Sequence, residues 1–252
     1  MADPILATEG LVKRFGALIA TDHVSLALAA GEVHALIGPN GAGKTTLIGQ
    51  LSGDIRPEAG RILFEGHDIT TLPSHRRARL GLARSFQITS IFLDMTVLDN
   101  VALAVQIHRG HSFHFWRNAR KDAGLRGPAR ELLALVGLER RADFVAADLS
   151  HGEHRQLEIA MALAGDPRVL LLDEPMAGMG PEESRRLIAL LREVKGERTV
   201  LLVEHDMDAV FALADRITVL VYGRAIATGS PEEIRANDEV RLAYLGDAQA
   251  TG

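Results

Sequence analysis

The sequence predicts an α/β protein with a mostly parallel sheet, into which a helical subdomain is inserted. Three observations lead to this prediction. Short apolar runs alternate with amphipathic stretches in the second half of the chain, as in strands joined by helical crossovers. A glycine-rich turn, Gly38–Thr46, stands between a strand-like run and a helix-like run. Another apolar run, Val169–Leu172, ends in the carboxylates Asp173 and Glu174.

The N-terminal part of the chain is β-rich. Ile5–Phe15 and His23–Ala29 are each predicted as a short β stretch ended by turn residues. Val33–Ile37 has the composition of a buried strand, and Thr46–Leu51 is predicted as the helix that follows the glycine-rich turn. Gly60–Gly66 is predicted as a further strand between glycines.

The rest of the chain divides into a helical segment and an alternating one. Residues from about 90 to 165 have helical periodicity, and Arg130–Gly137 is predicted as an amphipathic helix with a glycine C-cap. Strands and helices then alternate, so we expect a parallel sheet with right-handed crossovers. The predicted strands are Val169–Leu172, Thr199–Val203 and Ile217–Tyr222, with helices Pro181–Lys195 and Met207–Ala214 between them. A helical insert within one core fits this order better than two independent domains.

The composition is that of an ordinary folded protein. The 252 residues are 47% hydrophobic and 24% charged, and a chain of this length buries a sizeable core. The formal net charge of −5 argues against a general nucleic-acid binder. There is no cysteine, which excludes disulfides and thiolate chemistry and fits a cytosolic location. Met1–Pro4 lack the pattern of a signal peptide, and no apolar run approaches the ~20 residues that cross a bilayer. We therefore expect any membrane association to come through a partner.

The glycine-rich turn matches the phosphate-binding pattern GxxxxGK[ST]. Glycines let backbone N–H groups approach phosphate oxygens without a Cβ clash, and the dipole of the following helix adds partial positive charge. Lys44 is expected to reach the β- and γ-phosphates of a nucleotide, and the Thr45 hydroxyl to ligate Mg²⁺. The predicted nucleotide-binding residues of the turn are Gly38, Pro39, Asn40, Gly41, Ala42, Gly43, Lys44, Thr45 and Thr46.

The acidic strand end supplies the second half of a hydrolytic site. Asp173 can hold Mg²⁺ through water, and Glu174 can polarise the attacking water. An acid pair beside a phosphate site suits in-line phosphoryl transfer. Without the glycine-rich turn upstream, the two carboxylates would be typical of an exposed turn after a strand.

Two polar residues are candidate site residues because of their positions in the predicted fold. Gln87 stands at the predicted junction between the core and the helical insert. His205 follows the strand Thr199–Val203, and strand ends in such sheets face the ligand crevice. His205 could therefore hydrogen-bond the γ-phosphate and the attacking water. Taken singly, each residue is more typical of an ordinary surface position.

The segment Leu149–Glu158 is predicted to begin a helix, with Ser150 as N-cap and Glu153 completing a capping box. A helix N-terminus with a serine and a glycine, here Gly152, is again a phosphate-binding device. One subunit cannot easily place two such helix N-termini on the same γ-phosphate when they lie on separate lobes. The pattern therefore favours a head-to-tail dimer in which each subunit completes the other's site.

In this order the motifs resemble those of the nucleotide-binding subunit of an ATP-binding cassette (ABC) transporter. The resemblance covers residues 5–247 and includes the phosphate loop, Gln87, the signature Leu149–Glu153, the acid pair and His205. It implies a phosphate-loop NTPase core with a mostly parallel sheet and an N-terminal antiparallel β subdomain. It also implies a helical subdomain at about 90–165, inserted in that core, and a C-terminal tail at about 231–252.

The resemblance also implies ATP and Mg²⁺ as ligands, ATP hydrolysis as the activity, and a role for each site residue. Phe15 would stack on adenine, although an ordinary apolar residue at a hairpin would look the same. The other implied roles are Glu174 and His205 in catalysis, Thr45, Gln87 and Asp173 at the metal, and Ser150, His151, Gly152 and Glu153 acting on the partner's nucleotide.

Two positions depart from the family pattern. In this chain His151 stands where the usual LSGGQ signature has a glycine, so fewer backbone conformations are open at this position. Ser150 and Gly152 of the signature are intact. The loop after the acid pair usually ends in Leu-Asp or Leu-Asn and here ends in Met179-Gly180. Because that loop contacts the facing subunit in the family, the change bears on communication between the two sites.

Several stretches resemble the ATPase subunits of bacterial branched-chain amino acid importers. The same branch includes ATPases for urea and short amides, and a related branch serves lipopolysaccharide export. The ATPase does not touch the transported solute, so its sequence carries that identity only by association. The stretches are Lys13–Gly16, Arg84–Gln87, Glu204–Met207 and Ala243–Gly246.

The resemblance further implies the partners and the location. The partners would be integral-membrane permease subunits, a second ATPase subunit that is either a copy or a sister chain, and indirectly a solute-binding protein. The chain would be peripheral, at the cytoplasmic face of the bacterial inner membrane. A soluble ABC ATPase of DNA repair or of ribosomes is the competing class, but the chain has one cassette and no heptad array. A regulatory nucleotide binder without turnover is a third, and the intact Glu174 and His205 argue against it.

The segment His108–Arg117 holds three histidines and the only tryptophan. It could be a metal tract, although no carboxylate or cysteine accompanies the histidines. A docking element for a permease or a membrane surface is a second interpretation. A solvated insert of the family is the third.

Overall fold

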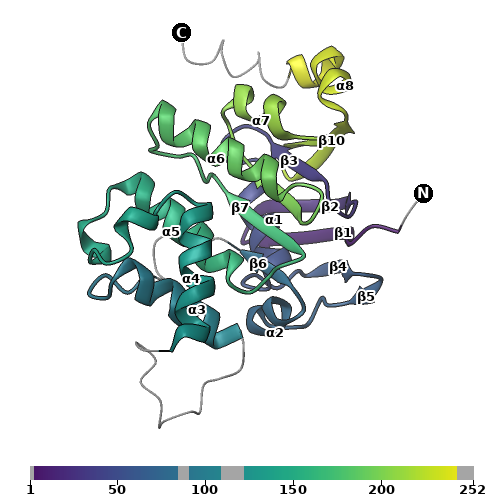
Figure 1. Cartoon of the computed structure of the whole chain (residues 1–252). Helices are drawn as coiled ribbons and strands as arrows, with labels where there is room; N and C mark the ends of the chain where they lie inside the picture. The colour runs from purple at the N-terminus through teal and green to yellow at the C-terminus, as the bar shows by residue number, and fades with distance from the viewer. Residues whose placement is uncertain (1–2, 85–90, 109–121, 243–252) are drawn as a thin grey trace.

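The computed structural model describes residues 3–84, 91–108 and 122–242, which form two sheets and a group of helices (Figure 1). The strands are β1 (Leu6–Phe15), β2 (Leu18–Leu28), β3 (Val33–Ile37), β4 (Ala59–Phe64), β5 (His67–Asp68), β6 (Leu82–Arg84), β7 (Val169–Asp173), β8 (Thr199–Val203), β9 (Arg216–Val221) and β10 (Arg224–Gly229). The helices are α1 (Lys44–Ser52), α2 (Ser74–Arg79), α3 (Val97–His108), α4 (Ala123–Leu135), α5 (His151–Leu163), α6 (Pro181–Val194), α7 (Met207–Leu213) and α8 (Pro231–Ala236). Short 3-10 turns lie at Glu139–Arg141 and Ala146–Asp148.

The larger sheet has six strands in the order β10-β9-β3-β8-β7-β6. All pairs are parallel except β10 with β9, so the predicted mostly parallel sheet is confirmed. The register places Leu36 and Asp173 each beside Val203 of β8. The loops that follow β3, β7 and β8 therefore leave the same edge of the sheet, which is where a ligand binds in such folds.

Strand β7 shows why the parallel strands are apolar throughout. Leu170 and Leu172 pack into the core formed with α5 and α6, whereas Val169 and Leu171 pack into the core formed with α1 and the antiparallel sheet. Both faces of the strand are thus covered, and an alternating polar pattern would place polar groups in one of the two cores.

The smaller sheet is antiparallel, in the order β2-β1-β4-β5, and lies on the opposite side of the molecule from α3, α4 and α5 (Figure 1). Strand β2 begins at Leu18, five residues before the predicted start at His23, so this boundary was wrong. The reason is a tight turn at Gly16, whose φ of 60° lets Leu18 pair directly with Phe15.

Helices α3, α4 and α5 form the helical subdomain. The predicted start of α4 at Arg130 was wrong, because the helix begins at Ala123, where the Asp122 side chain accepts a hydrogen bond from the Gly124 N–H. Pro128 lies inside the helix without ending it. The predicted glycine at its C-terminal end is confirmed, since Gly137, just after the C-cap, has a φ of 79° and donates to the Ala134 carbonyl.

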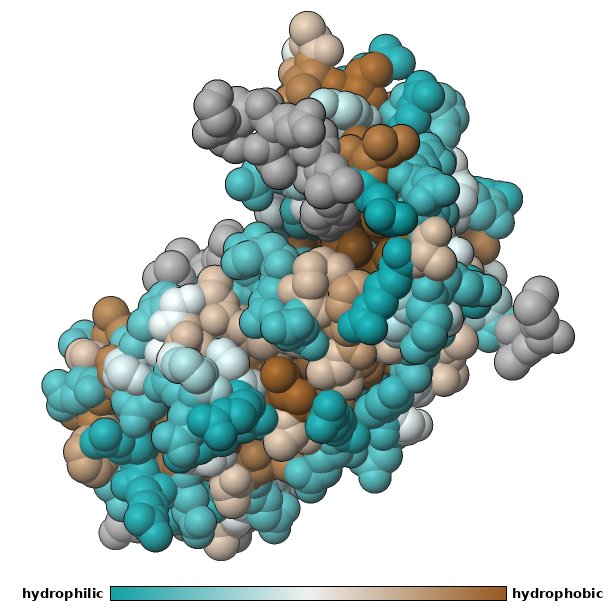
Figure 2. All heavy atoms as spheres, turned by 90° about the horizontal axis from the view of Figure 1, so that it is seen from above, coloured by the Kyte–Doolittle hydropathy of each residue, from teal (hydrophilic) through white to brown (hydrophobic). Residues whose placement is uncertain are grey.

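The face of the molecule seen in Figure 2 has small hydrophobic patches among hydrophilic residues. Large hydrophobic side chains that are exposed include Phe92, Leu93, Phe144 and Tyr222. Within the described ranges, no helix combines the length and the apolar character that crossing a membrane requires.

The C-terminal end of α1 is held by a buried cation. Arg77 of α2 is 1% exposed, and its guanidinium donates to the carbonyl oxygens of Gln50 and Leu51 at 2.7 Å each. It also donates to Leu72 and Thr70 carbonyls at 2.8 and 2.9 Å. Burial lowers the pKa of Arg77 to about 10, against the opposing fields of Asp54 and Asp68. The group therefore stays protonated at neutral pH and satisfies carbonyls that a helix end leaves open.

Replacing Arg77 with Met should lower the free energy of unfolding by about 3 kcal/mol or more, because four buried or partly buried carbonyls lose their donor. The measurement is chemical denaturation of the purified chain. Arg76→Met is the matched control, since Arg76 is exposed on the same helix and its loss should change stability by no more than about 0.5 kcal/mol. Equal effects of the two substitutions would contradict the anchoring role.

Candidate active site

The predicted phosphate loop joins β3 to α1 and is clamped by two backbone contacts. A Cβ on Gly38 would lie 2.0 Å from the Leu220 carbonyl oxygen of β9, and one on Gly43 would lie 2.0 Å from the Ala20 carbonyl oxygen of β2. Gly43 also has a φ of 101°, in the left-handed region. Any side chain at either position would displace the loop, so only glycine allows this path.

Lys44 is the first residue of α1 and is 8% exposed. Its Nζ donates to the carbonyl oxygens of Gly38 at 2.7 Å and Pro39 at 3.1 Å. Burial lowers the pKa of the ammonium, and the charges of Glu174 and Asp173 act in the opposite direction. The lysine of the loop therefore lies in the electric field of the two carboxylates at the end of β7. Thr45, the next residue, is exposed.

Asp173 ends β7 and is 5% exposed. Burial raises the pKa of its carboxyl group, Arg84 lowers it, and the neighbouring Glu174 raises it. The Arg84 Nη2 donates to Asp173 Oδ2 at 3.2 Å. Asp173 is thus a buried carboxylate whose charge depends on nearby cations.

Glu174 has a φ of 49°, which is uncommon for a residue with a Cβ. Its N–H donates to the Val203 carbonyl at 2.9 Å, which holds the strained backbone in place. The side chain is 43% exposed and lies toward His205, whose Nδ1 is 3.9 Å from Glu174 Oε1. The structure therefore brings together Lys44, Asp173, Glu174 and His205, four of the residues that the sequence predicts for the site.

Glu204 is a site residue that the sequence analysis missed. It is 2% exposed, and its carboxylate accepts hydrogen bonds from the N–H groups of Met176 at 2.9 Å and His205 at 3.2 Å. Burial raises its pKa, and the hydrogen bonds from these backbone groups lower it. Glu204 thereby ties the loop after the acid pair to the end of β8. Only its place between an apolar strand and His205 could have suggested this.

The predicted helix start at Ser150 is confirmed. Ser150 is the N-cap of α5, its Oγ accepts from the Glu153 N–H at 3.2 Å, and its own N–H donates to Glu153 Oε2 at 2.8 Å. The Arg141 Nε donates to Glu153 Oε1 at 2.8 Å. Burial raises the pKa of Glu153, but the hydrogen bonds from Ser150 and Arg141 outweigh it, so the net shift is downward. Glu153 is therefore an ionised structural cap.

The signature residues pack against the loop that follows the acid pair in the same chain. A Cβ on Gly178 would lie 2.6 Å from the His151 ring, and one on Gly152 would lie 2.3 Å from Glu183 Oε2 at the start of α6. Within the described part of the chain, no hydrogen bond or ion pair joins residues 150–153 to the phosphate loop or the acid pair. The two departures from the family pattern, at His151 and in the loop ending at Gly180, are thus neighbours in space.

The remaining predicted residues either lie apart from this cluster or fall outside the described residues. Phe15 is 51% exposed at the end of β1, with the Lys13 Nζ 5.3 Å from its ring centroid. Gln87 lies outside the described residues. The same holds for the histidine- and aromatic-rich segment after His108, and for the C-terminal stretch Ala243–Gly246.

The donor set suits Mg²⁺ bound together with a nucleotide. Over the described ranges there is no cluster of three or more His, Cys, Asp or Glu that could hold a metal by itself. Thr45 and Asp173 offer a hydroxyl and a carboxylate, which are hard oxygen ligands. Mg²⁺ commonly takes only one or two such protein ligands and completes its shell with water and substrate phosphates.

Comparison with known proteins agrees with this geometry. Residues 21–177 match the family model described as ABC transporter, and residues 226–250 match that of the branched-chain amino acid ATP-binding cassette transporter. The chain belongs to the ABC transporter family. This confirms the assignment made from the order of the motifs, and it makes the chain an ATPase.

The relatives of this ABC ATPase match it over nearly its whole length. The high-affinity branched-chain amino acid transport ATP-binding protein LivG of Salmonella typhimurium is 41% identical over 98% of this chain and 100% of its own. The lipopolysaccharide export system ATP-binding protein of Acidithiobacillus ferridurans is 36% identical over 96% and 97%. The crystal structure of the ADP conformation of an ABC transporter cassette has a TM-score of 0.85 at 33% identity, over 97% of this chain and 100% of that one. The predicted fold class is therefore confirmed.

Replacing Gly43 with Ala should abolish measurable nucleotide binding and lower the thermal midpoint, because the new Cβ collides with the Ala20 carbonyl. Gly66→Ala is the control, since Gly66 has a φ of 75° but no atom near its Cβ position. That variant should lose only about 1 kcal/mol of stability and bind nucleotide normally. Binding of a fluorescent ATP analogue tests both, and normal binding by Gly43→Ala would show that the loop does not need this path.

Proposed function

We propose that this ABC ATPase drives a membrane importer for branched-chain or related amino acids. The observation that supports hydrolysis best is the convergence at one edge of the sheet of the loop that carries Lys44 after β3, the acid pair at the end of β7 and His205 after β8. Import of amino acids is supported by the names of the relatives and by the match of residues 226–250 to the branched-chain amino acid cassette family.

The roles follow from the positions of the side chains. When ATP enters, Lys44 exchanges the carbonyl oxygens of Gly38 and Pro39 for the β- and γ-phosphates, while the N–H groups at the start of α1 face the phosphate oxygens. Thr45 and Asp173 would hold Mg²⁺, with Gln87 as a third ligand. The metal, when bound, neutralises phosphate charge as the γ-phosphoryl group is transferred.

The chemical step is in-line attack of water on the γ-phosphorus. Glu174 accepts a hydrogen bond from the water and draws off its proton, while His205 donates to the γ-phosphate and orients the water. A bond forms between the water oxygen and the γ-phosphorus, and the bond to the β–γ bridging oxygen breaks to release ADP and phosphate. The hydrogen bond from the His205 N–H to the Glu204 carboxylate fixes the backbone orientation at His205.

A second subunit would complete the site. Ser150 and Gly152 at the N-terminus of α5 would act on the nucleotide of the partner, because a helix N-terminus binds anions. The stacking of Phe15 on adenine would hold the base in its own subunit. Since His151 packs on Gly178, the signature would move together with the loop after the acid pair. ATP would favour the closed dimer, in which the two subunits meet over the nucleotides, because ATP would bind that state more tightly than the open one.

The proposed partners are integral-membrane permeases, a second ATPase chain that is a copy or a sister, and indirectly a solute-binding protein. The chain would lie at the cytoplasmic face of the bacterial inner membrane. Lipopolysaccharide export is the second candidate, because a relative with that name is 36% identical over nearly the whole chain.

Co-purification tests the transporter proposal. The chain would be tagged, solubilised from native membranes in mild detergent, and its bound proteins identified by mass spectrometry. Two polytopic permeases together with an amino-acid-binding protein would support the import proposal. Permease subunits of a lipopolysaccharide exporter would favour the second candidate. Recovery of soluble partners alone would contradict both.

Replacing Glu174 with Gln should reduce steady-state hydrolysis by about 10²-fold or more while ATP affinity changes little, because only the step that deprotonates water is lost. Phosphate release measures the first quantity and fluorescent nucleotide titration the second. Glu182→Gln, an exposed glutamate at the start of α6, is the control and should behave as the native chain. Turnover near the native rate in Glu174→Gln would remove this residue from the chemistry.

Replacing Lys44 with Ala should weaken ATP binding about tenfold or more, because a charge-assisted contact to two phosphates is lost. Lys195→Ala is the control, since Lys195 pairs with Asp215 at 2.6 Å and its side chain is 36% exposed. Calorimetric titration with ATP gives both affinities. An unchanged affinity in Lys44→Ala would refute the assigned phosphate contact.

A further inference from the structure

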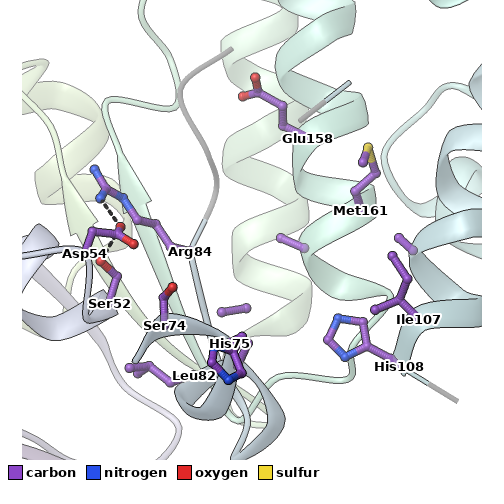
Figure 3. Close-up of a pocket in the computed structure, with 14 residues that line it drawn as sticks. Ser52, Asp54, Ser74, His75, Leu82, Arg84, Ile107, His108, Glu158 and Met161 are labelled. Atoms are coloured by element: carbon purple, nitrogen blue, oxygen red, sulfur yellow. Dashed lines mark hydrogen bonds and ion pairs between the residues drawn. The ribbon is translucent and has the colours of Figure 1, made fainter. Parts of the chain in front are cut away.

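One arginine connects the predicted metal carboxylate to a second carboxylate at the edge of a pocket. The Arg84 Nη1 donates to Asp54 Oδ2 at 2.9 Å, and its Nη2 donates to Asp173 Oδ2 at 3.2 Å. Figure 3 shows Arg84, Asp54 and Ser52 side by side on one wall of this pocket of about 310 Å³. Glu158 and Met161 of α5 stand across from them (Figure 3).

The position of Arg84 is fixed by the backbone. Arg84 ends β6, the edge strand of the large sheet, and pairs in register with Leu171 of β7, two residues before Asp173. The side chain is 14% exposed, so it is confined between β7 and the end of α1. This geometry lets the planar guanidinium present one nitrogen to each carboxylate.

Asp54 is fixed in turn by the end of the phosphate-loop helix. It follows Gly53, whose N–H caps α1, and its Oδ2 accepts a hydrogen bond from Ser52 Oγ at 2.7 Å. The helix that begins at the phosphate loop therefore ends at the group that holds Arg84. Asp173 is thus connected through Arg84 and Asp54 to the C-terminal end of the phosphate-loop helix.

One guanidinium shared by two carboxylates sets both the orientation and the charge balance of Asp173. The hydrogen bond engages Oδ2, which leaves Oδ1 as the oxygen that a metal or a metal-bound water can use. The attraction of Asp54 keeps the cation from resting wholly on Asp173, where it would repel an incoming divalent ion. Outer partners of this kind commonly change metal affinity by about 10–100-fold when removed.

We propose that Arg84, anchored by Asp54, is a positioning residue that orients Asp173 for the divalent cation of the nucleotide site. This inference rests on the proposed role of Asp173 at the metal. In this role Arg84 acts through the carboxylate of Asp173, to which it donates a hydrogen bond, and not by contact with the reacting atoms.

The test measures metal binding without turnover. Mn²⁺ is titrated into the chain saturated with ADP, and free Mn²⁺ is followed by electron paramagnetic resonance. Arg84→Gln should raise the dissociation constant of Mn²⁺ about tenfold or more, because the loss of the hydrogen bond that orients Asp173 outweighs the removal of one repelling positive charge. ADP affinity in the absence of metal should change less than about twofold. Arg168→Gln is the matched control, because Arg168 stands just before the opposite end of β7, pairs with Glu65 and should leave Mn²⁺ affinity unchanged.

Two conservative variants test the bridging geometry. Arg84→Lys should recover only part of the Mn²⁺ affinity, since one ammonium cannot hold both carboxylates at these positions. Asp54→Asn should raise the dissociation constant about threefold, because the uncharged amide releases the guanidinium toward Asp173. If Arg84→Gln does not fold, as judged by thermal unfolding, Asp54→Asn decides the question.

The outcomes separate this inference from the proposed function. An unchanged Mn²⁺ affinity in folded Arg84→Gln, or full recovery in Arg84→Lys, would overturn the positioning role while the metal site stands. Asp173→Asn must lose most of the Mn²⁺ affinity. If it does not, the assignment of Asp173 to the metal is wrong, and the role of Arg84 falls with it.

Discussion

The close approach of two backbone carbonyls to the phosphate loop is the constraint on which the rest of the site depends. The Leu220 carbonyl fills the space of a Cβ on Gly38, and the Ala20 carbonyl that of a Cβ on Gly43. Strand β9 of the parallel sheet and strand β2 of the antiparallel sheet thus hold the loop from two directions. The direction of α1, the position of Lys44 and the burial of its ammonium follow from this path.

The second property of the site is a balance of buried charges. Lys44 and Arg84 both lower the pKa of the buried Asp173 and so offset the cost of burying that carboxylate, while the neighbouring Glu174 is partly exposed. Lys44 uses carbonyl oxygens as partners, and these bonds can be exchanged for phosphate oxygens at little cost. A lysine in a direct salt bridge with Asp173 would have to break a stronger interaction first. The arrangement is therefore prepared for an anion and a divalent ion arriving together.

Much of this could be predicted from the sequence, because glycine patterns, apolar runs and a capping box act locally. The phosphate loop, the strand that ends at Asp173 and the helix that begins after Ser150 needed only neighbouring residues. The contacts of Glu204 could not be predicted in this way, since they join chain segments 28 residues apart. Nor could the Arg84 bridge, which depends on a three-residue edge strand too short to show any periodicity. Long-range contacts of polar side chains are set by the tertiary fold and leave no local pattern.

The most direct test of the account is a crystal structure of the Glu174→Gln variant with ATP and Mg²⁺. In that structure the Lys44 Nζ should have left the carbonyl oxygens of Gly38 and Pro39 and should lie on the β- and γ-phosphates. Mg²⁺ should lie between those phosphates and Asp173, with the loop itself unmoved between Ala20 and Leu220. A nucleotide bound elsewhere, with Lys44 still on its two carbonyls, would contradict the account.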